Sequence, residues 1–221
     1  SDHSLRFLSS FKGLSGLKSI GGDFEVNAKL FCFEYLASFE GLENLETIGG
    51  NFKVIAESSF KGLNGLKSIG GDFEVNANSS LESFEGLESL ETIGGNFKII
   101  DNESSLNALS SFKGLSSLKS IGGDFEVKAR VLESFEGLEN LTNIGDKLTI
   151  KGCSSLNNID ALKNIESLND ISITTCSKLY DFCVLKNVVQ NMSGTFYVND
   201  NGYNPTKYQL LNGECSQIPQ E

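Results

Sequence analysis

The chain has 221 residues, of which 39% are hydrophobic; it has no Trp, so its 16 Phe residues are the main bulky core formers. The net charge of −11 argues against binding to nucleic acid or to anionic lipid headgroups, both of which require a basic surface. No apolar run reaches the roughly 20 residues of a membrane-spanning helix. No signal segment opens the chain, so a secreted protein would be present here in processed form.

A repeated motif begins near the N-terminus and continues through most of the chain. Its consensus is L-x-x-F-x-G-L-x-x-L-x-x-I-G-G-x-F-x-V, as in residues 8–26. The first Phe recurs at intervals of 28, 21, 24, 28, 23, 24 and 23 residues, with the last two positions degenerate. These positions are Phe11, Phe39, Phe60, Phe84, Phe112, Phe135, Ile159 and Phe182. The sequence therefore predicts eight units.

The apolar spacing changes within each unit. From Leu8 to Ile20 an apolar residue occurs at every third position, which is typical of tight turns. From Phe24 to Val26 the spacing is two, as in a strand with one buried face, and residues 148–150, 171–173 and 196–198 take this place in the last three units. We expect the glycine pair between the two parts to allow positive φ at a sharp corner. Because so short a unit cannot bury its own apolar side, the units should stack as a solenoid with parallel strands.

Charges alternate in sign from one unit to the next. In a parallel stack, equivalent residues lie about 4.8 Å apart, where like charges repel by about 1 kcal/mol even in water. We therefore predict columns in which Lys faces Glu and which also fix the register. Duplication of a two-unit block could also have produced the alternation, and both explanations can hold at once. The columns are Lys12, Glu40, Lys61, Glu85, Lys113, Glu136; Lys18, Glu46, Lys67, Glu91, Lys119; and Glu25, Lys53, Glu74, Lys98, Glu126. Asp23, Asn51, Asp72, Asn96 and Asp124 follow the glycine pairs.

The string FxGLxxLxxIGGxFxV, with Leu three residues before the Phe, resembles the receptor L-domain family of leucine-rich repeats, and repeats of bacterial cell-surface lipoproteins look closer still. The resemblance covers about residues 5–198. It implies a mainly β, right-handed β-helix of about eight coils with short parallel strands and short helical turns. It also implies non-catalytic extracellular recognition or adhesion. The chain lacks the dense cysteine framework of the receptor lobes, so no ligand contacts are carried over.

We expect no catalytic, cofactor or metal site. His3 is the single histidine, so a Ser-His-Asp or Cys-His arrangement would have to use this one residue, which lies at the terminus. The glycine pairs lack a phosphate-loop pattern. A calcium-dependent polysaccharide lyase would need clustered carboxylates. Asp23, Asp72 and Asp124 should instead lie about 10 Å apart, two coils from one another.

The connecting segments 27–38 and 100–111 are the longest, and such segments often carry the function of a solenoid. The first presents Phe31, Phe33 and Tyr35 at alternate positions, which suits contacts with a protein or a sugar. The alternative is a lid packed over the first coils. Four N-x-[ST] sequons, at Asn78, Asn102, Asn140 and Asn191, are glycan sites in a eukaryotic secreted protein or are accidental.

Five cysteines are present, and an odd number leaves at least one thiol unpaired in a monomer. Cys153 and Cys176 each follow the last Ile of a strand by three residues and should be neighbours in one column. They form either a disulfide or a pair of buried reduced thiols. A disulfide between Cys183 and Cys215 would join the C-terminal segment to the last coil.

These observations predict a solenoid over residues 1–198 and a C-terminal cap over residues 199–221, which contain both prolines. The expected function is non-catalytic binding of a protein or glycan partner by an exported, monomeric or weakly oligomeric protein at the cell surface. Ser1 and Asp2 suit a chain trimmed after a lipid-bearing cysteine, as in an outer-membrane lipoprotein. The alternatives are a structural spacer or self-associating repeat protein and, third, a polysaccharide lyase.

Overall fold

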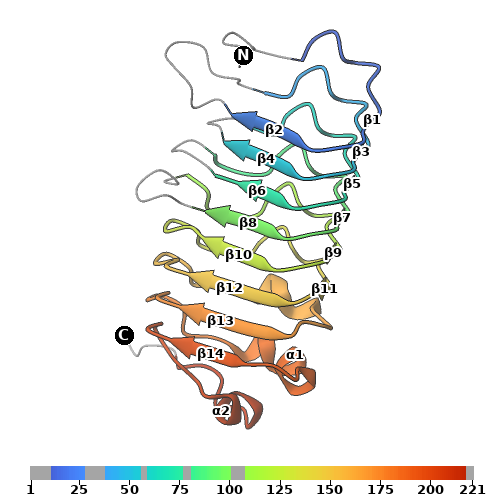
Figure 1. The fold of residues 1–221 in the computed structure, drawn as a ribbon. Coiled ribbons are helices and arrows are strands. Elements are labelled where there is room, and N and C mark those ends of the chain that lie inside the picture. Colours follow the sequence, from blue (N-terminus) through green and yellow to red (C-terminus); the bar gives the residue numbers. More distant parts are fainter. Residues whose placement is uncertain (1–10, 28–37, 56–58, 77–80, 101–107, 218–221) are drawn as a thin grey trace, which may run out of the picture.

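The computed structural model describes residues 11–27, 38–55, 59–76, 81–100 and 108–217. In this part the chain winds through successive coils, and the strands of these coils build two parallel sheets (Figure 1). The five described ranges give coil 1 (11–27), coil 2 (38–55), coil 3 (59–76), coil 4 (81–100) and coil 5 (108–128), followed by coil 6 (131–151). The predicted β-solenoid is therefore confirmed.

Coils 1 to 6 carry a strand in both sheets, and two further turns of the described chain add a strand to the larger sheet only. The number of complete coils thus differs slightly from the eight units expected. The smaller sheet contains β1 (Ser19–Ile20), β3 (Thr47–Ile48), β5 (Ser68–Ile69), β7 (Thr92–Ile93), β9 (Ser120–Ile121) and β11 (Asn143–Ile144). The larger sheet contains β2 (Phe24–Asn27), β4 (Phe52–Ile55), β6 (Phe73–Val75), β8 (Phe97–Ile100), β10 (Phe125–Lys128), β12 (Lys147–Lys151), β13 (Asp170–Thr174) and β14 (Phe196–Asn199).

Strand register follows the repeat. Every strand pair is parallel, and equivalent residues face each other, as Phe24 faces Phe52 and Glu25 faces Lys53. The alternation of the FxV segment explains the burial: in β6, Phe73 and Val75 are buried while the Glu74 between them is partly exposed.

Two columns of stacked phenylalanines fill the core. One column contains the first Phe of each motif and the other contains the strand Phe. Rings within a column are nearly parallel, as in Phe52 and Phe73, whose centroids lie 5.1 Å apart with planes at 2°. Rings of different columns meet edge to face, as in Phe60 and Phe73 at 5.8 Å and 74°. Both arrangements are favourable for aromatic rings, so the interior file of strand phenylalanines expected from the repeat is confirmed.

The three-residue spacing corresponds to consecutive tight turns. The amide of Leu42 donates to the carbonyl of Phe39 at 3.1 Å, and that of Leu45 donates to Leu42 at 2.9 Å. Gly41, inside the first of these turns, has a φ of +105°, and a Cβ there would lie 2.2 Å from the carbonyl oxygen of Phe11. Glycine is therefore required at this position by conformation and by space.

The paired glycines have a different role from the one expected. None of the five pairs of the motif has a positive φ. In the four later pairs, glycine is required because neighbouring coils approach closely: a Cβ on Gly70 would lie 2.3 Å from the Gly49 carbonyl oxygen, and one on Gly71 2.4 Å from Oδ1 of Asn51. The expectation of positive φ at the pairs is wrong, and the left-handed glycine is the one in FxGL.

The predicted charge columns include five ion pairs among the described residues. They are Lys12–Glu40 at 3.3 Å, Lys53–Glu74 at 3.4 Å, Lys67–Glu46 at 2.7 Å, Lys113–Glu136 at 3.4 Å and Lys119–Glu91 at 2.7 Å. Four of the pairs are exposed, whereas the side chains of Lys53 and Glu74 are only 35% and 30% exposed. Exposed ion pairs each contribute little to stability. Their larger effect is on register, because a shift by one coil would bring like charges together.

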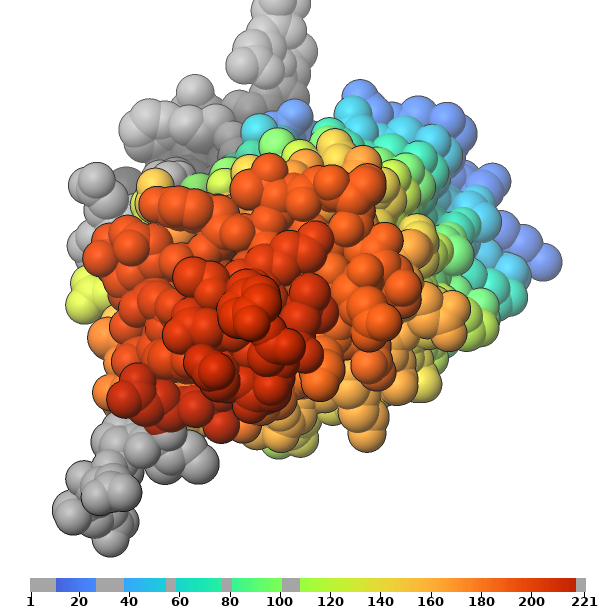
Figure 2. All heavy atoms as spheres, turned by 90° about the horizontal axis from the view of Figure 1, so that it is seen from below, coloured from blue at the N-terminus to red at the C-terminus, as the bar shows by residue number. Residues whose placement is uncertain are grey.

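The C-terminal part of the described stack contains four short helices. They are η1 (Asp160–Asn164), η2 (Cys183–Leu185), α1 (Lys186–Asn191) and α2 (Lys207–Leu211). The last of them packs against α1. In Figure 2, which views the molecule from this end, the last part of the described chain covers the stack. Leu210 of α2 is fully buried, and a disulfide joins Cys183 to Cys215. Among the described residues, no helix has the length and apolar character needed to cross a membrane.

Candidate functional site

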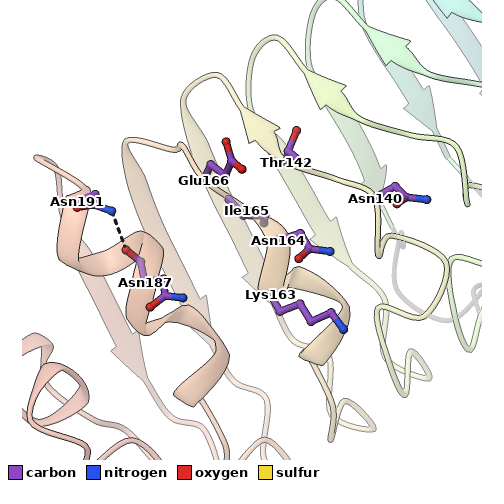
Figure 3. A pocket seen from close by; sticks show the side chains of 8 residues that line it. All are labelled: Asn140, Thr142, Lys163, Asn164, Ile165, Glu166, Asn187 and Asn191. Carbon is purple, nitrogen blue, oxygen red and sulfur yellow. Dashed lines mark hydrogen bonds between the residues drawn. The ribbon is translucent and has the colours of Figure 1, made fainter.

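A polar groove of about 420 Å³ lies where the smaller sheet ends. After β11 the smaller sheet has no further strand among the described residues, and Ser167 of the next coil forms only a single parallel bridge to Asn143. The helical turn η1 takes the place of the tight turns that precede this corner, and α1 follows one coil later. These turns border the groove shown in Figure 3. Its lining consists of Asn140, Thr142, Lys163, Asn164, Ile165, Glu166, Asn187 and Asn191.

Three of these asparagines occupy the same position in successive turns of the chain. Asn140, Asn164 and Asn187 each follow a buried Leu by two residues and precede a buried apolar residue. We call them the asparagine column. The Nδ2 group of Asn140 donates to the Ser116 carbonyl at 2.7 Å, and that of Asn164 donates to the Glu139 carbonyl at 2.6 Å.

Those bonds orient the amides and leave acceptors for a ligand. Within the described part of the chain, no hydrogen bond reaches the Oδ1 atom of Asn140 or Asn164. At the far side of the groove, Nδ2 of Asn191 donates to the Asn187 carbonyl at 3.2 Å, a bond drawn in Figure 3. The groove therefore presents side-chain amide oxygens whose orientation is fixed by hydrogen bonds from the Nδ2 groups to the preceding coil.

Two charged side chains complete the lining. Glu166 continues the column of Lys18, Glu46, Lys67, Glu91 and Lys119, but its neighbour in coil 6 is Thr142, whose carbonyl accepts from the Glu166 amide at 2.8 Å. Neither Glu166 nor Lys163 forms an ion pair with another described residue. Both are exposed, so both are free to contact a bound molecule.

The chemistry of the groove is that of hydrogen bonding. Amides donate and accept, and the Thr142 hydroxyl can accept, because its proton is donated to the Lys119 carbonyl at 3.2 Å. Glu166 adds an acceptor group and Lys163 a donor group. Ile165 is the one apolar residue of the lining and is 3% exposed. The site can thus hold a polar ligand with many hydrogen-bonding groups.

The aromatic candidates from the sequence, Phe31, Phe33 and Tyr35, lie outside the described residues, as does His3. Exposed aromatics among the described residues are Tyr197 on β14 and Tyr208 on α2, 51% and 76% exposed. Of the four sequons, Asn78 and Asn102 are also outside the described ranges. Asn140 and Asn191 both line the groove.

The cysteines form one disulfide and one pair of thiols. Cys183 and Cys215 are bonded, with Cα atoms 4.8 Å apart. Cys153 and Cys176 are free and buried. They are neighbours in one column, because Lys151 and Thr174, which precede them by two residues, are paired across β12 and β13. A hydrogen bond with Cys176, together with burial, raises the pKa of the Cys153 thiol. Such a pair packs as small apolar side chains.

Sequence reasoning did not identify the groove, although a signal for it exists. The segments Leu-Glu-Asn-Leu at 138–141, Leu-Lys-Asn-Ile at 162–165 and Leu-Lys-Asn-Val at 185–188 place Asn at one position of three successive units. Recurrence of a polar residue in a stacked repeat predicts a column. The hollow beside it depends on η1 and α1, which the motif does not predict.

No group of three or more His, Cys, Asp or Glu side chains in the described ranges lies close enough to hold a metal ion. Comparison of the sequence with protein-family models and with curated proteins found no match to either.

Proposed function

We propose that this protein is a non-catalytic recognition module and that the groove beside the asparagine column binds a glycan. The observation that carries the proposal is the column itself: three amides from successive turns, two of them oriented by hydrogen bonds of 2.6 and 2.7 Å to the preceding coil. Preorganised donors and acceptors lower the entropic cost of binding. A sugar chain offers matching rows of hydroxyl groups.

A polar groove suits a glycan better than a protein partner. Protein interfaces depend on buried aromatic or arginine anchors, and the lining contains neither type of side chain. The uncharged Asn and Thr groups form short hydrogen bonds with hydroxyls at a low desolvation cost. Glu166 and Lys163, without ion-pair partners in the described chain, add stronger charge-assisted bonds at specific hydroxyls.

The proposed location is outside the cell, at its surface. Support comes from the Cys183–Cys215 disulfide, since stable disulfides form mainly in oxidising compartments. The resemblance of the repeat to receptor L-domains and to bacterial surface lipoproteins supports the same location. A lipid anchor upstream of residue 1 would hold the module at the surface.

The test is a glycan array probed with the full chain, produced in a bacterial host so that the Asn140 and Asn191 sequons stay unmodified. Binding of the best glycan is then measured by calorimetry for Asn140→Ala and, as a matched control, for Asn44→Ala. Asn44 is the equivalent residue of coil 2, and its Nδ2 also donates to a carbonyl of the preceding coil at 2.7 Å. Both substitutions therefore have the same structural cost, but only Asn140 lines the groove.

We expect Asn140→Ala to weaken binding about tenfold, the equivalent of one lost hydrogen bond of about 1.4 kcal/mol, and Asn44→Ala to leave it unchanged. Equal effects of the two variants would place the site elsewhere. A chain that binds no glycan on the array would favour the alternative of a structural spacer.

A further inference from the structure

The polar groove runs across successive turns of the chain and not along one of them. Its asparagine column has one member on coil 6, Asn140, one at the end of η1, Asn164, and one in α1, Asn187, and Figure 3 shows the three one after another. A second row lies two residues further along each turn, where Thr142 of coil 6 is followed by Glu166. The lining of the groove therefore repeats with the stack.

The repeat distance along these rows is set by the stacking of the coils. At the groove, the Glu166 amide donates to the Thr142 carbonyl at 2.8 Å, and Nδ2 of Asn164 donates to the Glu139 carbonyl at 2.6 Å. In the larger sheet, the strands of the same three turns, β12, β13 and β14, are paired in register. Neighbouring parallel strands lie about 4.8 Å apart, so each turn advances the rows by about that distance.

The direction of the rows decides how a chain-like ligand can lie in the groove. Along a single turn, a ligand would meet one amide only, because Asn164 is followed by Ile165, which is 3% exposed and has no hydrogen-bonding group in its side chain. Across the turns, the ligand meets an amide at every step. Lys163 and Glu166 lie on opposite sides of the asparagine column in Figure 3, so they flank this path.

The asparagines keep hydrogen-bonding capacity for such a ligand. Oδ1 of Asn140 and of Asn164 receives no hydrogen bond from a described residue, and the Asn187 side chain forms none within the described ranges. Sugar hydroxyls can donate to these oxygens. A ligand whose units follow one another at the coil spacing can therefore place one hydroxyl-bearing unit on each asparagine.

Glycans differ in whether their units keep this spacing along a straight line. Pyranose units joined through equatorial bonds, as in β-1,4-linked glucan, form a straight chain that advances by one sugar length per unit, close to the coil spacing. In α-1,4-linked glucan, the axial bond of each unit makes the chain coil into a helix. Successive units of such a helix turn away from a straight row, so the groove matches the first class.

We propose that the groove binds a straight, equatorially 1,4-linked glycan that lies along the stack, with one sugar unit on each member of the asparagine column. This inference rests on the proposed function, because it specifies the class and the direction of the glycan at the same site. Three sugar units occupy the three asparagines, and a fourth extends past them. The affinity should therefore depend on the length of the glycan up to three units.

The test compares oligosaccharides of two to five units that differ in linkage. Cello-, manno- and chito-oligosaccharides are the straight β-1,4-linked series, and malto-oligosaccharides are the helical series. Binding to the full chain from a bacterial host is measured by calorimetry. From two to three units, the affinity of a straight series should rise about fivefold, the effect of one net hydrogen bond, and then stay within about twofold. The malto-oligosaccharides should show no such step.

Variants of the column test the direction of the ligand. Asn140→Ala removes the first member, so the step from two to three units should disappear while the disaccharide still binds. Asn44→Ala removes the equivalent bond of coil 2, outside the groove, and should keep the step.

The outcomes separate this inference from the proposed function. A step that survives Asn140→Ala, an affinity that does not depend on length, or equal affinity for the malto-oligosaccharides would overturn the inference and leave the glycan-binding function standing. Array hits confined to helical or branched glycans would do the same. Absence of binding to every glycan, on the array and in these series, would overturn the proposed function itself.

Discussion

Oδ1 of Asp72 accepts a hydrogen bond from the backbone amide of Asn96, one coil later in the stack, at 2.7 Å. The same bond joins each neighbouring pair along this column, as Asn51 accepts from Asp72 and Asn96 accepts from Asp124, both at 2.8 Å. The accepting oxygen lies where a side chain on the next glycine pair would be, 2.3 Å from a Cβ built on Gly95. Asp and Asn both supply this oxygen, so their alternation keeps the hydrogen bonds while separating the charges.

Asp72→Ala should lower the free energy of unfolding by about 1–2 kcal/mol, because it leaves the Asn96 amide without its acceptor. Asp72→Asn retains a side-chain oxygen and should cost less than half as much. Guanidinium-induced unfolding measures both. Equal losses of unfolding free energy for the two variants would show that the stabilising effect of Asp72 does not come from this hydrogen bond.

Gly70→Ala should destabilise the protein by about 2 kcal/mol or more, since its methyl group would overlap the Gly49 carbonyl oxygen at 2.3 Å and force the coils apart. The control is Gly21→Ala, at the same position of coil 1, where a Cβ meets nothing within 4 Å. Thermal melting of both variants tests the pair. A large loss for Gly21→Ala would mean that glycine is needed there for another reason.

Phe73→Ala should cost about 3–5 kcal/mol, because the ring lies between Phe52 and Phe97 at centroid distances of 5.1 and 5.0 Å and its removal leaves a cavity. Phe73→Leu should cost less, since Leu148 fills the same position in coil 6. Tyr197→Ala removes an aromatic that is 51% exposed and provides the control. Similar losses for Phe73→Ala and Tyr197→Ala would contradict the packing argument.

Replacing Cys183 and Cys215 together by Ser should lower the free energy of unfolding by about 3–4 kcal/mol, as expected for a disulfide that closes a loop of 32 residues. A reducing agent should destabilise the wild-type chain by a similar amount and leave the double variant unchanged. Denaturant unfolding with and without the reductant checks both statements. A reductant effect on the double variant would implicate other cysteines.

Acid should remove the contribution of two surface ion pairs. Hydrogen bonds from Lys67 and Lys119 lower the pKa of Glu46 and Glu91 below the ordinary value of 4.5. Because the folded-state pKa is the lower one, the stabilisation is present above pH 4.5 and is lost as the pH falls through the folded-state pKa. Glu46→Gln with Glu91→Gln should flatten the pH dependence of the melting temperature in that range.

The control for this measurement is Glu166→Gln, because this exposed carboxylate has no ion-pair partner among the described residues. The melting temperature of this variant should follow that of the wild-type chain as the pH is lowered. A pH dependence flattened equally by Glu166→Gln would show that the effect does not come from the paired carboxylates.

Much of the fold could be predicted from the sequence, because the apolar spacing within each unit and the recurrence of the unit both constrain it. The two-residue alternation of Phe24 and Val26 predicts which face of the strand is buried, and recurrence of the motif predicts that Phe24 and Phe52 face each other. The opposite charges of Glu25 and Lys53 agree with that register, since equivalent residues of stacked coils must be neighbours. Spacing and sign alone were enough for these predictions.

Only the tertiary structure revealed the roles of individual glycines, because these roles depend on the path of the backbone and on the spacing of neighbouring coils. Which glycine adopts positive φ, Gly41 in the turn and not Gly49 or Gly50, depends on the local direction of the chain, and the closeness that excludes a Cβ at Gly70 exists only after stacking. The groove likewise depends on the helical turns η1 and α1, which contain Asn164 and Asn187. A repeat motif describes what neighbouring units share, whereas a groove arises where they stop being alike.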